Sequence, residues 1–356
     1  MFLVQFSPVS TFTNTYEMPT NIGAYLVQSG QPLELRTAPY PTPKEHEIVV
    51  RARALAINPC DYACQMIPAM FPWLKLPAVI GEDVAGDVME VGPGVTDFKV
   101  GDRVLGHSLE AFQAYPVIKD HMAASIPKSM SYEDASVIPL GLSTVAMALF
   151  PPDFLGLPYP SSKPNQTGKA LLIWGASTSV GCNAIQAAVA AGYEVITTAS
   201  PKNFGLAKKL GASTVFDYNS PTVAEDLVSA FKGKHCTGAL AISGISLETR
   251  NRVARTCSEI VAKSEGDKFV ALTMPGTDGH HPDVGTKFVN AVGLHEEREL
   301  GYAIFRDWLP QAMAEGKFTA APAPEVVGVG LGALQGAMDK LKFQGVSAQK
   351  LVVRLD

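Results

Sequence analysis

The sequence predicts an α/β protein in which a doubly wound parallel sheet is combined with a second, irregular β-rich domain. The length of 356 residues exceeds the size at which single hydrophobic cores stop growing. Apolar runs alternate with helical patterns between residues 143 and 320, as a parallel sheet covered on both faces requires. The region from residue 21 to 142 is rich in strand patterns and is punctuated by Pro and Gly, which is typical of an irregular β domain.

We divide the chain accordingly into an N-terminal tail over residues 1–20, a β-rich domain over residues 21–142 and 321–356, and a parallel-sheet domain over residues 143–320. The tail has no periodicity, and its start lacks the basic residues and the long apolar core of a leader, so we expect no cleaved signal. In the β-rich domain, the alternation within Glu47–Ala54 predicts a half-buried strand.

The parallel-sheet domain is expected to continue past an insertion, Pro151–Gly168, that is rich in Pro, Ser and Gly. It ends in a helix from about Glu297 to Glu315, and the final strand, Lys350–Leu355, is expected to rejoin the β-rich domain. The predicted strands of the parallel sheet are Leu171–Trp174, Glu194–Ala199, Gly238–Ser243, Lys268–Thr273 and Lys287–Val292.

The first of these strands leads into a small-residue turn, Gly175-Ala176-Ser177-Thr178-Ser179-Val180-Gly181, and then into a helix. Gly175 and Gly181 permit a tight turn with close backbone approach, and the helix start offers free N–H groups to a pyrophosphate. Because Thr178 stands where a middle glycine is usual, the turn alone fits a packing connection equally well. The strand Glu194–Ala199 follows an Ala-rich helix and completes a βαβ unit of the expected length, which favours a dinucleotide-binding site.

The end of that second strand distinguishes the two nicotinamide dinucleotides. An NAD site usually has Asp or Glu there to accept a hydrogen bond from the ribose, whereas the 2′-phosphate of NADPH needs a cation or donors instead. This chain has Ser200-Pro201-Lys202-Asn203. Lys202 can pair with the phosphate, and Ser200 and Asn203 can donate to it, so we expect NADPH. The alternative is that Lys202 is a solvated surface lysine.

Charge and cysteine content argue against several classes of partner. The net charge of -5 is mild and no basic run or basic amphipathic helix is present, so we expect neither nucleic acid nor a membrane surface as a partner. No apolar stretch approaches the length of a membrane span. The five cysteines are an odd number without a disulfide-like spacing, which indicates free thiols in a reducing, cytoplasmic compartment.

A second dense signal is the pair of segments Gly81–Val95 and Phe98–Val104. Glycines punctuate the first segment, and the second ends in a Gly-Asp-Arg-Val sequence. From about Asn21 onward the chain resembles the medium-chain dehydrogenase/reductase superfamily, in which these segments shape a GroES-like catalytic domain beside the active site. The resemblance implies that residues 143–320 form a Rossmann domain for NADPH.

The metal ligands of the zinc alcohol dehydrogenases in that superfamily are not present here. Where those enzymes carry Gly-His-Glu, this chain has Gly81-Glu82-Asp83, and Asn58 stands where they place a cysteine three residues before an aspartate. Zinc needs three Cys, His or carboxylate donors around an open position, so we expect no metal. We interpret the remaining candidate ligands, Cys60, Cys64, His107 and His121, as packing, structural or surface residues.

The segment Asn58-Pro59-Cys60-Asp61 is similar to the Asn-Pro-x-Asp stretch of the zinc-free branch, the quinone oxidoreductases and enoyl reductases, which reduce activated double bonds. Many relatives have a lysine shortly after this aspartate, where Tyr62-Ala63-Cys64 stands here, so no role of that lysine is transferred. A closer likeness, to the fungal trans-acting enoyl reductases that serve polyketide synthases, including the lovastatin one, and to toxin-cluster oxidoreductases, is carried by Gly175–Thr178, Ser200–Phe204 and Val215–Tyr218.

The resemblance implies roles for individual residues. It places Thr144 closest to the nicotinamide, with Tyr62 and Asn58 as further candidate catalytic donors. The implied cofactor-binding residues are Asn58, Pro59, Cys60, Asp61, Gly175, Ser177, Thr178, Ser179, Val180, Gly181, Ser200, Lys202, Asn203, Tyr218, Val346 and Ser347. The implied substrate-side residues are Gly141, Leu142, Ser143, Thr144, Gly293 and Leu294.

We therefore expect an NADPH-dependent reductase of a carbon–carbon double bond conjugated to a carbonyl. Without zinc to polarise a simple carbonyl, a conjugated acceptor is the easier substrate, because its enolate needs only hydrogen-bond donors and a proton. Two alternatives stay open: a carbonyl reductase or alcohol dehydrogenase on the same fold, and a non-catalytic NADPH-binding subunit or redox sensor. The expected substrate is a small-molecule or carrier-bound enoyl compound, with a polyketide synthase as a candidate partner, and the protein is expected to be a monomer or homodimer. The loops Pro68–Pro77 and Pro151–Gly168 are expected to shape the pocket.

Overall fold

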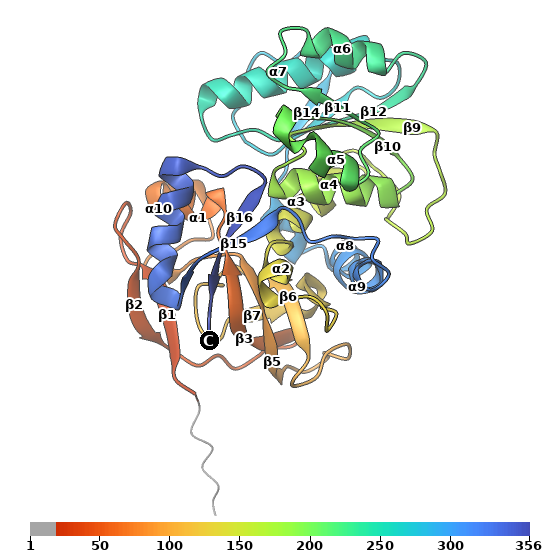
Figure 1. The fold of residues 1–356 in the computed structure, drawn as a ribbon. Coiled ribbons are helices and arrows are strands. Elements are labelled where there is room, and N and C mark those ends of the chain that lie inside the picture. Colours follow the sequence, from red (N-terminus) through yellow and green to blue (C-terminus); the bar gives the residue numbers. More distant parts are fainter. Residues whose placement is uncertain (1–18) are drawn as a thin grey trace, which may run out of the picture.

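The structure, a computed structural model, describes residues 19–356 and is built around two large sheets (Figure 1). The predicted tail over residues 1–20 lies outside the described residues apart from Pro19 and Thr20, which are exposed. One sheet is wholly parallel and the other is mostly antiparallel and irregular. The predicted combination of a Rossmann-type parallel sheet with a β-rich part is confirmed.

The β-rich part contains a seven-stranded sheet in the order β15-β16-β3-β5-β6-β8, with β7 paired to β3. Val352 of the last strand lies opposite Ala56, so the C-terminal segment pairs with the N-terminal one as expected. A smaller sheet has the order β2-β1-β4. The strands are β1 (Asn21–Leu26), β2 (Glu34–Ala38), β3 (Glu47–Ala56), β4 (Ala78–Val79), β5 (Asp83–Val91), β6 (Arg103–His107), β7 (Val117–Lys119), β8 (Ala123–Ser125), β15 (Ala323–Val329) and β16 (Gln349–Arg354).

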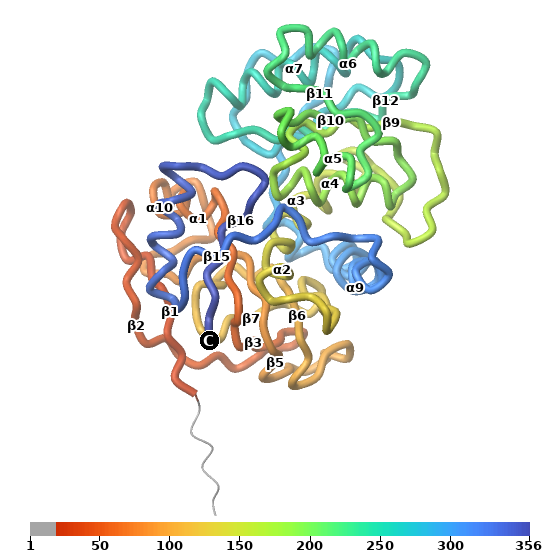
Figure 2. The backbone as a smooth tube through the Cα atoms, viewed as in Figure 1, coloured from red at the N-terminus to blue at the C-terminus, as the bar shows by residue number. Residues whose placement is uncertain are grey.

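Short helices connect the strands of these two sheets. Helix α1 contains the predicted site residues Pro59, Cys60, Asp61 and Tyr62. It packs beside α10 (Figure 2). The helices of this part are α1 (Pro59–Met66), η1 (Pro68–Met70), η2 (Asp120–Met122), α2 (Tyr132–Ser136), η6 (Leu331–Ala333) and α10 (Leu334–Gln344).

The second sheet has six parallel strands in the order β11-β10-β9-β12-β13-β14. The order reverses between β9 and β12, which is where a doubly wound fold binds its ligand. The predicted strand Lys287–Val292 is displaced, because the sheet strand ends at Phe288 and a short helix, η4, begins at Ala291. The strands are β9 (Lys169–Trp174), β10 (Glu194–Ala199), β11 (Thr214–Asp217), β12 (His235–Ala241), β13 (Phe269–Leu272) and β14 (Gly285–Phe288).

The predicted helix near Glu297–Glu315 forms, but its middle is a π-helix, η5, between α8 and α9. Pro310 has no amide hydrogen for the carbonyl one turn earlier, which favours a wider turn at this place. The helices here and in the parallel-sheet part are α3 (Pro139–Leu149), α4 (Ser179–Ala190), η3 (Pro201–Asn203), α5 (Phe204–Lys209), α6 (Val223–Ala230), α7 (Leu247–Lys263), η4 (Ala291–His295), α8 (Arg298–Gly301), η5 (Tyr302–Trp308) and α9 (Leu309–Ala314).

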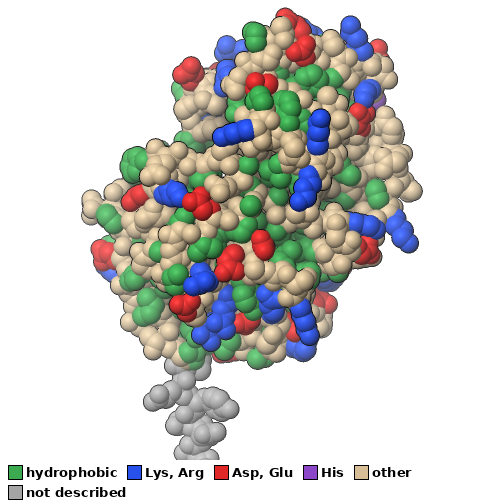
Figure 3. Space-filling view, in the orientation of Figure 1, with side chains coloured by type: hydrophobic (Ala, Val, Ile, Leu, Met, Phe, Trp, Pro, Cys, Tyr) green, Lys and Arg blue, Asp and Glu red, His purple; other side chains and the backbone are tan. Residues whose placement is uncertain are grey.

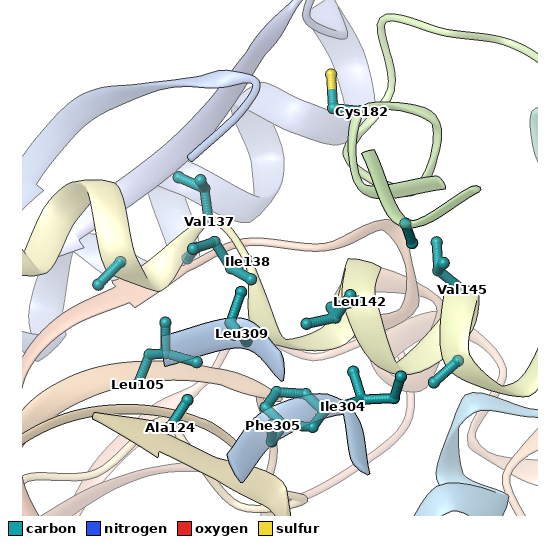
Figure 4. Packing of buried hydrophobic residues seen from close by; sticks show 14 of the residues in the cluster. Leu105, Ala124, Val137, Ile138, Leu142, Val145, Cys182, Ile304, Phe305 and Leu309 are labelled. Atoms are coloured by element: carbon teal, nitrogen blue, oxygen red, sulfur yellow. The ribbon is translucent and has the colours of Figure 1, made fainter. Parts of the chain in front are cut away.

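Helix α3 lies at the junction of the two parts and is held there by a continuous apolar core. Figure 4 shows Leu142 of α3 near Leu309 and Phe305, with Leu105 of β6 beyond Leu309 and Val145 of α3 on the opposite side of Leu142. The same cluster of buried residues continues to Cys182 of α4. The residues of α3 are therefore fixed with respect to both sheets.

The surface of the molecule carries mixed charge. Figure 3 shows Lys and Arg side chains interspersed with Asp, Glu and apolar side chains on one face. Within residues 19–356, no helix is both long enough and apolar enough to cross a bilayer.

Candidate functional site

The turn between β9 and α4 has the geometry of a phosphate-binding turn. Gly175 has a φ of 98°, which favours glycine, and a Cβ on Gly181 would lie 2.1 Å from the Gly175 carbonyl oxygen. Thr178 is the N-cap of α4: its Oγ1 accepts from the Gly181 N–H at 2.9 Å and donates to the Gly175 oxygen at 2.9 Å. The threonine that replaces the middle glycine therefore holds the turn together.

The start of α4 fits the negative charge of a pyrophosphate. The helix is twelve residues long, and the first N–H groups of a helix have no partner within it. The Oγ of Ser179 is buried and has no hydrogen-bond partner among the described residues. Ser177 and Val180, the neighbouring predicted contacts, are partly exposed. A phosphate at this helix end would satisfy both the backbone N–H groups and the serine hydroxyl.

The predicted 2′-phosphate residues meet a distant segment of the chain. Asn203 Nδ2 donates to Ser200 Oγ at 3.1 Å and to Ser347 Oγ at 3.2 Å, although Asn203 and Ser347 are 144 positions apart. Lys202 and Val346 are exposed beside this contact, and no ion pair involves Lys202 within residues 19–356. Tyr218, just after β11, is partly buried. It packs against an apolar cluster of the parallel-sheet part that includes Trp174 and Ile196. The structure thus brings together Ser200, Asn203 and Ser347, as a shared binding surface requires.

A buried polar cluster fixes the start of α1. Asn58 is the N-cap of this helix, and its backbone N–H donates to Asp61 Oδ2 at 2.7 Å. Asn58 Nδ2 donates to Asp83 Oδ2 at 2.8 Å, and Lys350 Nζ donates to Asn58 Oδ1 and lies 3.0 Å from Asp83 Oδ2. Burial and then the neighbouring Glu82 carboxylate raise the pKa of Asp61. The side chain of Asn58 is therefore engaged mainly with protein groups.

Sequence reasoning did not assign Lys350 or Asp83 to the site. Lys350 is only 5% exposed and stands on the last strand, and Asp83 is fully buried at the start of β5. The available signal was a lysine at the head of an otherwise apolar run, Lys350-Leu351-Val352-Val353. A buried lysine needs a buried carboxylate partner, but the sequence does not say which one.

Glu82 belongs to a second buried polar chain. His107 is fully buried; its Nε2 lies 3.0 Å from Glu82 Oε2 and its Nδ1 lies 2.9 Å from Ser143 Oγ. His107, expected to be a structural or surface residue, thus lies inside the protein. Within the described part of the chain, no group of three or more His, Cys, Asp or Glu side chains is arranged to hold a metal ion.

The predicted substrate-side residues differ in how far they are buried. Leu142, Ser143 and Leu294 are fully buried, so they support the site from behind. Gly141 lies where a Cβ would come within 2.6 Å of Asn183 on α4, and a Cβ on Gly293 would lie 3.2 Å from Met147. Thr144 remains slightly exposed, and its Oγ1 donates to the Leu140 oxygen at 2.9 Å.

The candidate donor Tyr62 and the predicted cofactor contact Cys60 are both neutral at physiological pH. Burial raises the pKa of the Tyr62 phenol, and the nearby Cys60 thiol adds to the effect. Burial and then the Glu82 carboxylate raise the pKa of Cys60. Pro59 is exposed at the first position of α1, next to this pair. All five cysteines of the chain are free thiols.

Comparison with known proteins identifies the family. Residues 44–133 match the family model described as the alcohol dehydrogenase GroES-like domain. The chain is 52% identical over 348 residues to Dehydrogenase azaJ of Aspergillus niger, which covers 95% of this chain and 100% of that relative. The chain belongs to the medium-chain dehydrogenase/reductase superfamily.

Within the medium-chain dehydrogenase/reductase superfamily, the chain belongs to the enoyl-reductase-like branch. It is 38% identical over 321 residues to Trans-enoyl reductase himH of Aspergillus japonicus, covering 87% of this chain and 90% of that one. The crystal structure of CurK enoyl reductase shares the fold, with a TM-score of 0.74 at 20% identity over 94% of this chain and 99% of that chain. The resemblance found in the sequence is thus confirmed. This member of the superfamily is an oxidoreductase, and the family relation indicates a nicotinamide cofactor.

Proposed function

We propose that this oxidoreductase is a zinc-independent, NADPH-dependent reductase of a carbon–carbon double bond conjugated to a carbonyl, acting on an enoyl thioester or quinone-like substrate in secondary metabolism. The observation that carries the proposal is the engagement of both carboxylates in Gly81-Glu82-Asp83. Glu82 lies against His107, and Asp83 against Lys350 and Asn58. These groups are occupied by protein partners, and the neighbouring donors are neutral hydroxyl and thiol groups, which suit an enolate better than a metal-bound alkoxide.

Preference for NADPH is supported by the residues after β10. That strand is followed by Ser200, Lys202 and Asn203 and has no carboxylate at its end. A 2′-phosphate here would gain the positive charge of Lys202 and hydroxyl donors from Ser200 and Ser347. A carboxylate in the same place would repel it.

Bound NADPH would supply a hydride to the β carbon of the acceptor. The side chains of the site then have to orient the substrate carbonyl and stabilise the enolate oxygen. Tyr62, held protonated by burial, can donate to that oxygen. Thr144 can do so if its hydroxyl turns away from the Leu140 carbonyl. Asn58, with its side chain bound to Asp83 and Lys350, holds α1 in place so that Tyr62 keeps its position.

The setting of this activity is proposed from the relatives and the composition. Relatives named trans-enoyl reductases support a small-molecule or carrier-bound enoyl substrate, presented by a polyketide synthase. Five free cysteines are consistent with a reducing cytoplasmic compartment. The protein is expected to work as a monomer or homodimer.

An isotope experiment tests the reaction type. NADPH carrying deuterium at the transferable position is incubated with the protein and an enoyl thioester, and the product is analysed by mass spectrometry and NMR. Double-bond reduction places the label on the β carbon and a solvent proton on the α carbon. A label on a carbinol carbon, from reduction of the carbonyl, would contradict the proposal.

A further inference from the structure

A large cavity in the β-rich part is not accounted for by the residues discussed so far. Its volume is ≈ 700 Å³, and it lies between the smaller sheet, the first residue of β3, the loop after β6 and η4. Much of its wall is apolar and comes from Ala38, Trp73, Ala78, Val79 and Leu109. Trp73 belongs to the loop Pro68–Pro77, which was expected from the sequence to shape the pocket.

Two polar side chains of the wall, Gln113 and Lys119, are already bound to other protein groups. Gln113 Oε1 accepts from Asn21 at 2.8 Å, and its Nε2 donates to the Glu110 carbonyl at 2.7 Å. Lys119 Nζ donates to the His295 carbonyl at 2.9 Å and to Glu296 at 3.1 Å. Apart from His295 Nε2, which is buried and has no hydrogen-bond partner among the described residues, these groups leave little hydrogen-bonding capacity for a polar ligand.

The charges around the cavity do not favour an ionic ligand either. Two carboxylates, Glu47 and Glu110, are balanced by two ammonium groups, Lys75 and Lys119. Lys75 and Glu110 are exposed. A site for a phosphate or carboxylate would present an excess of positive charge. The occupant that fits is uncharged and mainly apolar.

The cavity adjoins the predicted substrate side of the site. His295 lines it and directly follows Leu294. The ring of His295 lies 4.7 Å, centroid to centroid, from that of His107, which in turn contacts Ser143 at 2.9 Å. Ser143 is the neighbour of Thr144 on α3. The side chains of His295 and His107 thus lie between the cavity and α3, so the alkyl chain of a substrate held near α3 would have to pass beside His295 to enter the cavity.

We propose that this cavity binds the alkyl chain of the substrate, so that the protein prefers uncharged enoyl thioesters of medium or greater chain length to short ones. The assignment rests on the proposed double-bond reduction and deepens it. Cavities of roughly 300–1,000 Å³ enclose drug-sized ligands, and a four-carbon acyl group would leave most of this one empty. The walls offer apolar contact along its length, which is what distinguishes a long chain from a short one.

The expected preference follows from the number of buried methylene groups. Full burial of one methylene group strengthens binding by about fourfold. A methylene group that gains only half of that free energy still strengthens binding by about twofold. A decenoyl thioester has six methylenes more than a butenoyl thioester, so kcat/KM should favour the longer substrate by about 50-fold or more. This ratio is measured by NADPH oxidation with the two pantetheine thioesters.

Filling the cavity should remove that preference. Ala78→Phe places a ring inside the wall, whereas Val100→Phe enlarges a side chain that is 63% exposed and serves as the matched control. We expect Ala78→Phe to lower kcat/KM for the decenoyl substrate at least tenfold and leave the butenoyl rate within twofold. Leu109→Trp, on the loop after β6, tests the same wall if Ala78→Phe does not fold. Two results would overturn the assignment and leave double-bond reduction standing. One is equal rates of the wild-type protein on both chain lengths; the other is an unchanged chain-length preference in both Ala78→Phe and Leu109→Trp.

A binding measurement separates the failure of this proposal from the failure of the proposed function. Trp73 lines the cavity and is 39% exposed, whereas Trp174 and Trp308 are buried, so saturated decanoyl pantetheine should change the fluorescence of Trp73 and have no such effect in Trp73→Phe. Butyryl pantetheine should give a much smaller change at equal concentration. A decanoyl response without turnover of any enoyl thioester would support the chain-binding cavity and contradict the reductase. No response to the decanoyl compound would contradict the cavity assignment whether or not turnover is seen.

Discussion

Replacement of Lys350 by Met should destabilise the protein strongly, because it removes the cation from a buried cluster. Lys350 is 5% exposed and Asp83 is fully buried, with 3.0 Å between Nζ and Oδ2. Breaking one partner of such a pair typically costs about 3–5 kcal/mol, since the other charge stays buried. Asp83 would keep hydrogen bonds from Asn58 at 2.8 Å and from the Leu140 N–H at 2.6 Å, so we expect the lower end, about 3 kcal/mol.

The assay is urea denaturation followed by far-ultraviolet circular dichroism. Lys340→Met is the matched control, because Lys340 pairs with Glu325 at a surface where both side chains are about a third exposed, and such pairs contribute about 0–1 kcal/mol. The double variant Lys350→Met with Asp83→Asn should recover part of the loss, since no unpaired charge remains. A Lys350→Met variant within about 1 kcal/mol of the control would refute the view that this cluster fixes α1.

Four further predictions follow from the site. Lys202→Ala should weaken NADPH binding about tenfold and NADH binding less than twofold, as measured by fluorescence titration, with the exposed Lys208→Ala as control; equal losses for both cofactors would remove the phosphate role. Thr144→Val should lower kcat about 100-fold with little change in NADPH affinity, and Thr144→Ser should restore much of it; an unchanged rate would leave the hydroxyl with its structural bond to Leu140 alone. Burial, and then His107 and two further neighbours, lower the pKa of His295 to about 2, so the folded state binds fewer protons than the unfolded one and stability should fall as pH drops below about 6.5. His295→Gln should reduce that loss between pH 7.5 and 5.5 by about 1.4 kcal/mol, and an identical pH profile would contradict the assigned burial. Elemental analysis of the purified protein should find less than one zinc per chain, whereas stoichiometric, tightly held zinc would overturn the branch assignment.

The parts of the fold that the sequence predicted are those with local causes. The strand Glu194–Ala199 agrees with β10 residue by residue, because the β-branched residues from Val195 to Thr198 favour a strand. The turn from Gly175 to Gly181 was recognised from its glycines, and the structure explains Thr178 as the N-cap. The π-helix at η5 was not predicted, because Pro310 marks a disturbed helix in the sequence but does not tell a π-helical turn from an ordinary break.

The parts of the site that the sequence did not predict depend on contacts between distant positions. Lys350, Asn58 and Asp83 come from the last strand, the N-cap of α1 and the start of β5. The contact between Asn203 and Ser347 likewise joins positions 144 residues apart in the sequence. Neither pairing can be derived before the topology is known. The roles of Tyr62 and Thr144 toward the substrate stay predictions.

The central claim is reduction of a conjugated double bond without zinc, and one measurement tests it most directly. NADPH oxidation by metal-stripped protein is followed with an enoyl thioester and, separately, with the saturated aldehyde of the same chain length. We expect the protein to consume NADPH with the enoyl thioester and not with the aldehyde, and we expect no gain in rate when zinc is added back. Consumption with the aldehyde alone, or activity that appears only on addition of zinc, would contradict it.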